Sequence, residues 1–274
     1  MRMKEFAKTG MKVSDVGVGT YYDPLWIAMA FLGWRRGAPS KIEAVKTAIE
    51  AGVTLVDTAE IYQSEPLVGE AVKNAKRDDL FVATKVWSNH LHGDALTRAF
   101  EKSLKRLGLS YIDLYQVHWP NPRVPMRETM SAMEELIAAG KLKHVGVSNF
   151  SLEQIKEAQV ALRRAELSSV QLDYSLIHRN VEADILPYCD REKMALMAYY
   201  PLGHGKLVND QRLGEAAVKY QKSKAQVALG WLARKENVFP IPRASRSNHV
   251  RENAAAGDFD LSDSDVAELE KRFQ

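Results

Sequence analysis

The sequence predicts an α/β fold, a parallel eight-stranded (β/α)8 TIM barrel, and two observations support this class. Eight short runs rich in Val, Leu, Ile and Tyr alternate with stretches whose apolar residues recur at helical spacing. Most of these runs do not alternate between apolar and polar residues, as expected of strands buried on both faces of a parallel sheet. The predicted strands are residues 15–20, 54–58, 80–85, 111–118, 143–149, 168–173, 194–200 and 237–243.

The helical stretches between the strands have recognisable start and stop signals. Ser40, Ser151 and Ser223 each stand three residues before Glu or Gln, which is the pattern of a capping box, and Ser262 has Asp in that position. Gly52 lies where a glycine commonly ends a helix. These signals predict helices that begin at the four serines.

The length and composition suit one barrel domain over residues 1–274. The chain has 274 residues, of which 46% are hydrophobic, and no Pro/Gly-rich linker divides it. We also expect an N-terminal hairpin and a long first strand-to-helix loop. An open doubly wound sheet is the alternative, but "GVGTYY" contains only half of the G-x-G-x-x-G motif, and no helix follows it directly.

Charge and apolar patterning restrict the partners. The formal net charge is +3 without a long Lys/Arg block, so we expect no nucleic-acid partner. The apolar run "LWIAMAFL" is far shorter than the roughly 18 residues of a membrane span, so we expect no membrane partner. The single cysteine, Cys189, and the lack of a secretion signal favour a cytoplasmic protein. We expect a monomer or a weak homo-oligomer.

Polar side chains end seven of the eight predicted strands. Most are separated by about 30 residues, the length of one β-α unit. Because the carboxyl ends of parallel strands meet at one rim of a barrel, these side chains are expected to share a pocket, which Tyr62 can reach from the second strand's loop. The residues at the strand ends are Asp57, Lys85, His118, Ser148 with Asn149, Gln171, Tyr199 and Arg243.

Four of these residues form a chemically coherent set. Taken singly, Asp57 could cap a helix and His118 could be a core histidine; the combination favours a site. Tyr62 is suited to be a general acid if Lys85 lowers the pKa of its phenol and Asp57 keeps Lys85 charged. His118 would orient a substrate oxygen. Since none of the four is placed as a nucleophile, the hydride for a carbonyl would come from a cofactor.

These segments resemble the aldo-keto reductase superfamily over essentially the whole chain. The matching motifs, in order, are "GVGT", "DTAEIY", "TKVW", "QVHWP", "GVSNF", "VQLDYSL", "AYYPLG" and "IPRASRSNHVRENAAA". The resemblance implies a catalytic tetrad of Asp57, Tyr62, Lys85 and His118 with Tyr62 as the acid. It also implies reduction of aldehydes or ketones to alcohols.

The same resemblance implies NADPH as the cofactor, with NADH possible. Ser148, Asn149 and Gln171 would bind the nicotinamide carboxamide, and Tyr199 would stack on the ring. Arg243, Ser245 and Arg246 would lie near the 2′-phosphate. Tyr200 stands where many members have serine. The implied cofactor residues are Gly19, Thr20, Ser148, Asn149, Gln171, Tyr199, Leu202, Gly203, Arg243, Ser245, Arg246, Glu252 and Asn253.

Aromatic residues suggest the walls of a pocket for a small-molecule carbonyl substrate: Tyr21, Tyr22, Trp26, Trp87 and Trp119. The apolar segment 21–40, which follows the first strand, has three open interpretations. It could pack on the barrel as a short helix, form a dimer contact, or act as a lid over the substrate.

Three other functions remain as alternatives. An NADPH-binding regulatory subunit, like the channel β-subunits of the superfamily, could retain an intact tetrad. A Schiff-base aldolase would use Lys85, although the cofactor motifs argue against it. Metal catalysis by His90 and His92 lacks an obvious carboxylate partner, so we expect no metal.

Overall fold

The computed structural model describes all 274 residues. Strands β3 to β10 form one parallel sheet in sequential order, and β1 pairs with β2 in an antiparallel hairpin. The strands are β1 Met3–Glu5, β2 Lys12–Ser14, β3 Val18–Gly19, β4 Leu55–Asp57, β5 Phe81–Val86, β6 Ile112–Val117, β7 Leu142–Ser148, β8 Leu167–Asp173, β9 Ala195–Tyr199 and β10 Val238–Pro240.

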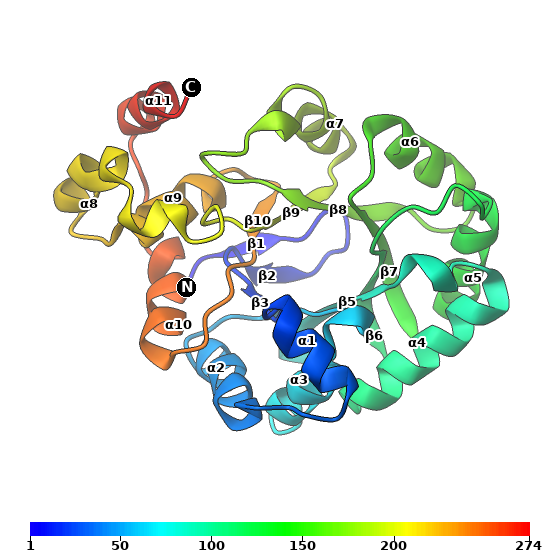
Figure 1. Cartoon of the computed structure of the whole chain (residues 1–274). Helices are drawn as coiled ribbons and strands as arrows, with labels where there is room; N and C mark the ends of the chain where they lie inside the picture. The colour runs from blue at the N-terminus through cyan, green and yellow to red at the C-terminus, as the bar shows by residue number, and fades with distance from the viewer.

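The sheet closes into a barrel with helices around it (Figure 1). Gly17 N donates to Pro240 O at 2.9 Å and Gly19 N donates to Pro242 O at 3.0 Å, which joins the first barrel strand to the last. The helices are α1 Pro24–Phe31, α2 Ala38–Glu50, α3 Glu65–Val72, α4 Gly93–Leu107, α5 Met126–Ala138, α6 Leu152–Ala161, α7 Ile185–Glu192, α8 Gly214–Tyr220, α9 Lys224–Ala233, α10 Ser247–Ala254 and α11 Asp263–Arg272. The predicted barrel and its N-terminal hairpin are confirmed.

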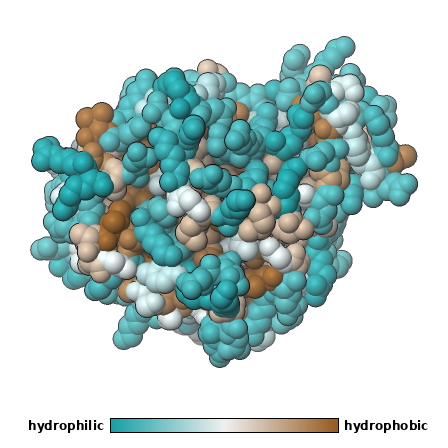
Figure 2. Space-filling model, turned by 180° about the vertical axis from the view of Figure 1, so that it is seen from behind, coloured by the Kyte–Doolittle hydropathy of each residue, from teal (hydrophilic) through white to brown (hydrophobic).

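The barrel interior is a packed core that the hairpin closes at one end. Phe6, which follows β1, is fully buried and contacts the rings of Phe81 and Phe239, with centroids 4.5 and 5.0 Å away. Figure 2 shows the side that carries the hairpin, where mostly hydrophilic residues surround separate apolar groups. The opposite end of the barrel is therefore the one left for a site.

The polar residues at the strand ends point toward the barrel axis, on the same side of each strand as the apolar residues of the inner core. Successive residues of a barrel strand point alternately inward and outward. On β5, Phe81 and Ala83 belong to the cluster inside the barrel, whereas Val82 belongs to the cluster between the strands and the helices. Lys85 continues the inward column above Ala83. Asp57 stands in the same way above Leu55 on β4.

The predicted helix starts are confirmed at three of the four serines. Ser151 and Ser223 form capping boxes, and the Ser262 side chain accepts from Asp265 N. The capping box expected at Ser40 is wrong. Helix α2 begins two residues earlier, after Gly37, whose left-handed φ of 71° sets the turn, and the Ser40 hydroxyl donates to Gly37 O.

The long first loop contains helix α1, which stands above the rim beside α3 (Figure 1). Trp26 and Ala30 on its inner face pack with Tyr22 and with Leu67 of α3. Apolar side chains on the outer face and in the turn that follows are exposed, and these are Leu25, Phe31, Leu32 and Trp34. No helix in the structure has both the length and the apolar character needed to cross a bilayer.

Candidate active site

A buried ion pair forms the floor of the rim pocket. Lys85 Nζ lies 2.8 and 2.7 Å from the two carboxylate oxygens of Asp57 and donates to Thr58 O at 2.8 Å. Both side chains are almost completely buried. Burial raises the pKa of Asp57 and lowers the pKa of Lys85, while their contact acts against both shifts. The three acceptors use all three ammonium protons, which favours the charged pair.

Tyr62 and His118 meet above this pair. The Tyr62 hydroxyl lies 3.3 Å from His118 Nε2, and Lys85 Nζ lies 5.0 Å from the centre of the Tyr62 ring. Tyr62 ends a short 3₁₀ turn, Glu60–Tyr62, that leads away from β4. The structure therefore brings the four predicted tetrad residues together, although they come from three strand ends and one loop.

The electrostatics of Tyr62 differ from the sequence-based expectation. Burial raises the pKa of Tyr62 well above its usual value, and the nearby Asp57 carboxylate adds to the rise. The expected lowering by Lys85 is therefore incorrect, because Asp57 balances the lysine charge at close range. Burial and Lys85 lower the pKa of His118 to about 2, so its imidazole is neutral.

Amide and hydroxyl groups join the neighbouring strand ends into one network. Gln171 Nε2 donates to Asp57 Oδ1 at 2.9 Å, and Ser148 Oγ donates to Gln171 O at 2.9 Å. Asn149, with a left-handed φ of 61°, donates to His118 O at 2.9 Å and accepts from the Tyr199 hydroxyl at 2.8 Å. Gln171 and Asn149, which are predicted to bind the nicotinamide, thus also hold Asp57 and His118 in place.

The remaining predicted cofactor residues follow β3, β9 and β10. Thr20 Oγ1 donates to Asp57 O at 2.9 Å, which ties the loop after β3 to the site. The turn after β9 closes when Gly203 N donates to Tyr200 O at 2.8 Å. Leu202 lies within this turn, and its carbonyl oxygen accepts from Gly205 N at 3.0 Å. Gly203 has a φ of 55°, and a side chain there would collide with Ile177.

Beyond β10, residues 243–246, which include two arginines, form few contacts with the rest of the chain. Arg243 donates to Ser245 Oγ at 2.9 Å, and neither Arg243 nor Arg246 forms an ion pair with a carboxylate. Glu252 accepts from His249 at 3.2 Å, and Asn253 is buried against the barrel side of α10. The arginines are therefore available to an anion.

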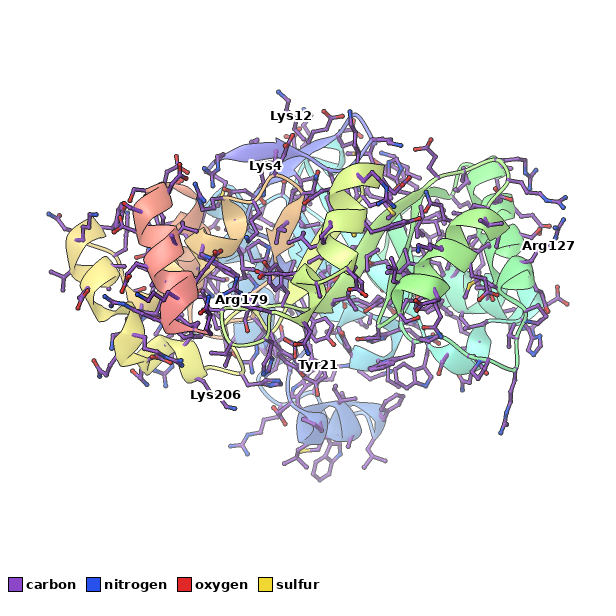
Figure 3. The ribbon with its side chains drawn as sticks, turned by 90° about the horizontal axis from the view of Figure 1, so that it is seen from above. Lys4, Lys12, Tyr21, Arg127, Arg179 and Lys206 are labelled. Carbon is purple, nitrogen blue, oxygen red and sulfur yellow. The ribbon has the colours of Figure 1, made fainter.

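Two of the five predicted substrate-pocket residues, Tyr21 and Trp87, contact Tyr62 or His118. The Tyr21 ring meets Tyr62 edge-on at 5.1 Å, and Trp87 meets His118 at 5.3 Å. Trp119, which follows His118, is 46% exposed. Figure 3 shows Tyr21 at the base of α1, on the side of the barrel opposite Lys4 and Lys12.

Tyr22 and Trp26 are not brought to Tyr62. Their rings contact each other at 5.0 Å and pack with Leu67 beneath α1, and both side chains are buried. Trp26 Nε1 donates to Arg36 O, which closes the segment on itself. These contacts support the helix rather than surround the tetrad.

The alternative metal site has no structural support. His90 pairs with Glu60 and His92 pairs with Glu128, so the two histidines bind different carboxylates. The structure contains no cluster of three or more potential metal ligands.

One contact of the site was not anticipated from the sequence. Thr58 contributes its backbone carbonyl to Lys85, and its hydroxyl lies 3.0 Å from Ser64 Oγ, which in turn lies 3.1 Å from Thr20 Oγ1. A carbonyl acceptor has no side-chain signature, so only its place directly after Asp57 could have suggested it.

Comparisons with known proteins identify the family of this chain. The model of the "Aldo/keto reductase family" matches residues 28–272. Methylglyoxal reductase YeaE of Escherichia coli (strain K12) is 36% identical over 242 residues, covering 85% of this chain and 84% of that protein. Glyoxal reductase of Bacillus subtilis (strain 168) is 36% identical over 230 residues, covering 83% and 82%.

Solved structures extend the likeness to the fold. The thermostable aldo-keto reductase Tm1743, crystallised with the inhibitor epalrestat, has a TM-score of 0.89 and 36% identity, with 99% of both chains covered. An aldo/keto reductase from Klebsiella pneumoniae in complex with NADP and acetate has a TM-score of 0.87 and 32% identity, covering 100% of this chain and 96% of that one. With the family model matching nearly the whole barrel, this chain belongs to the aldo/keto reductase family of oxidoreductases.

Proposed function

We propose that the protein is an NADPH-dependent reductase that converts aldehydes or ketones to alcohols. The observation that carries the proposal is the pairing of the Tyr62 hydroxyl with neutral His118 at 3.3 Å, directly above the Asp57–Lys85 pair. Two hydrogen-bonding groups at one point of a partly dehydrated rim can bind a carbonyl oxygen. The Klebsiella relative crystallised with NADP supports the choice of cofactor.

The residues around the tetrad fit a dinucleotide with a phosphate. Arg243 and Arg246 are free of carboxylate partners, and the Tyr199 ring lies half-buried at the end of β9. Tyr199 would stack on the nicotinamide, Asn149 and Gln171 would hold its carboxamide, and the arginines would bind the 2′-phosphate. When bound, NADPH supplies a hydride to the carbonyl carbon.

Tyr62 supplies the matching proton. As the carbonyl carbon gains the hydride, its oxygen becomes an alkoxide, which is a stronger base than a phenolate. The alkoxide can therefore take the proton of Tyr62, and the raised pKa keeps the phenol protonated until then. His118 holds the oxygen in place without adding a charge, because its pKa of about 2 keeps it neutral.

We infer that small aldehydes and α-dicarbonyls are among the substrates. The relatives are named as reductases of methylglyoxal and glyoxal. Tyr21 and Trp87 border the tetrad with aromatic surface, which tolerates apolar substituents. A panel of methylglyoxal, glyoxal and aromatic aldehydes, followed by loss of NADPH absorbance, would rank them.

The variant Tyr62→Phe tests the role of the acid. It removes the one oxygen that donates the proton, so kcat is expected to fall by about 100-fold or more. NADPH affinity, measured by fluorescence titration, is expected to stay unchanged because Tyr62 is outside the proposed cofactor contacts. A variant that keeps more than about a tenth of the wild-type kcat would show that Tyr62 is not the acid.

A further inference from the structure

Two cations from distant parts of the sequence meet at Tyr22. Lys41 lies in the first turn of α2, and its Nζ is 4.8 Å from the centre of the Tyr22 ring. The guanidinium carbon of Arg243, which follows β10, is 5.8 Å from the same ring. Lys41 Nζ also lies 5.2 Å from the Trp26 ring, so two aromatic residues hold the lysine side chain.

Neither cation is neutralised by a carboxylate. Arg243 donates to Ser245 Oγ, and Lys41 has only a long contact of 3.5 Å with Arg36 O. Asp23, whose charge acts on Lys41, caps α1 by accepting from Trp26 N at 2.8 Å. Glu43, two residues from Lys41 in the sequence, forms no ion pair with it. Partial burial and the Arg243 charge lower the pKa of Lys41, as expected when like charges are brought together.

The sequence around Lys41 reinforces this imbalance. Residues 23–43 contain three basic residues, Arg35, Arg36 and Lys41, against two acidic ones, Asp23 and Glu43, and neither acid forms an ion pair with Lys41. A cluster of like charges without internal partners costs free energy unless an anion binds there. The local charge therefore points to a ligand with negative charge.

Helix packing fixes Lys41 beside the proposed phosphate residues. Helices α2 and α10 lie side by side (Figure 1). Thr47 Oγ1 donates to Ser247 Oγ at 3.3 Å, and Arg251 pairs with Glu50 at 3.5 Å. These contacts hold the second half of α2 against α10. The start of α2 then lies close enough to the turn before α10 that Lys41 and Arg243 both reach the Tyr22 ring.

We propose that Lys41 is an additional ligand of the 2′-phosphate of NADPH and a determinant of cofactor specificity, an inference that rests on the proposed function. Lys41 and Arg243 would approach the phosphate together. Tyr22 and Trp26 hold the lysine stem in the required direction, which gives the segment before α2 a role on the cofactor side of the site.

Two substitutions separate charge from packing. Lys41→Met keeps an apolar stem against Tyr22 and Trp26 but removes the charge, whereas Lys41→Arg keeps the charge. Lys41→Met is expected to bind NADPH roughly tenfold more weakly, as for the loss of one hydrogen bond to a charged group, with NADH affinity unchanged. Lys41→Arg should retain most of the NADPH affinity. Lys46→Met, on a different face of α2, is the matched control and should behave as the wild type.

Fragments of the cofactor provide a second readout without turnover. Calorimetric titration with adenosine 2′,5′-bisphosphate should show the same loss in Lys41→Met as NADPH, and 5′-AMP should show none. An equal loss for NADPH and NADH would place the charge at the pyrophosphate and overturn the assignment. Unchanged NADPH affinity in Lys41→Met beside a clear loss in Arg243→Ala would exclude Lys41 as a ligand and leave the proposed function intact. A wild-type protein that binds no NADPH would refute the function itself.

Discussion

Lys85 illustrates how burial determines the chemistry of single residues at this rim. Its three ammonium protons are all donated to Asp57 and Thr58. The Asp57 charge therefore cancels most of the effect of the Lys85 charge on Tyr62. Removing Lys85 would leave the buried Asp57 carboxylate without a countercharge, with the Gln171 amide still donating to it, and this costs about 3–5 kcal/mol. Changes at this pair therefore affect stability as well as activity, and Tyr62 is the cleaner probe of the reaction.

The buried His118 makes the stability of the protein depend on pH, which can be tested. Burial lowers the pKa of this histidine from 6.5 to about 2, so the unfolded chain binds its proton first as the pH falls. The contribution of His118 to the free energy of unfolding is complete above pH 6.5. It decreases at lower pH by about 1.4 kcal/mol per pH unit.

Urea unfolding of the wild type and of His118→Gln between pH 7 and 5 measures this contribution. The wild type is expected to lose stability relative to the variant once the pH falls below about 6.5, the ordinary pKa of histidine. A difference between the two proteins that stays constant over this range would contradict a neutral, buried His118.

At the scale of elements, helices α3 and α4 of neighbouring β-α units pack closely against each other. Glu65 at the start of α3 accepts from Arg106 near the end of α4 and from Thr84 of β5. Gly69 lets the two helices approach, because a Cβ there would lie 2.6 Å from Leu107 O. Because Thr84 directly precedes Lys85, the Glu65 contact ties the start of α3 to the strand that carries Lys85.

Gly69→Ala tests this crossing. Alanine favours a helix by about 1 kcal/mol, but overpacking against backbone that cannot move aside costs about 1–3 kcal/mol, so net destabilisation is expected. Gly93→Ala is the control, since nothing lies within 4 Å of a Cβ at the start of α4, and it should be neutral or stabilising. Thermal melting of both variants is the measurement, and equal stability would argue against a tight crossing.

For the whole molecule, the barrel has one end for stability and one for chemistry. The hairpin closes the far end with Phe6, whose ring is fully buried between Phe81 and Phe239. Figure 3 shows Lys4 and Lys12 of the hairpin on the opposite side from Tyr21. Substitutions at the two ends should therefore have separable effects.

Phe6→Ala is expected to lower the free energy of unfolding by about 3–5 kcal/mol through the cavity it leaves. The folded variant should bind NADPH much as the wild type does, because Phe6 lies at the hairpin end and, of the proposed cofactor residues, only Tyr199 packs against its apolar cluster. Denaturant unfolding and fluorescence titration of the same preparation check both parts. A loss of NADPH affinity in fully folded protein would show that the hairpin end of the barrel and the rim that carries the site are coupled.

Local patterns in the sequence were sufficient for the barrel and for much of its rim. Each strand shows its own apolar run, and strand alternation carries Leu55 and Asp57, or Phe81 and Lys85, into one inward column without reference to any other part of the chain. Capping boxes at Ser151 and Ser223 were equally predictable, because their partners lie three residues away.

Only the tertiary structure decided features that depend on distant neighbours. The pKa of Tyr62 rises because burial and the Asp57 charge outweigh a lysine that is already paired. Trp26 turns away from the tetrad because Leu67 of α3 offers an apolar surface. Lys41 and Arg243 are about 200 residues apart in the sequence and meet at one ring, because the closed barrel places α2 beside α10. Charge and solvation act through space, so such pairings cannot be read from neighbours along the chain.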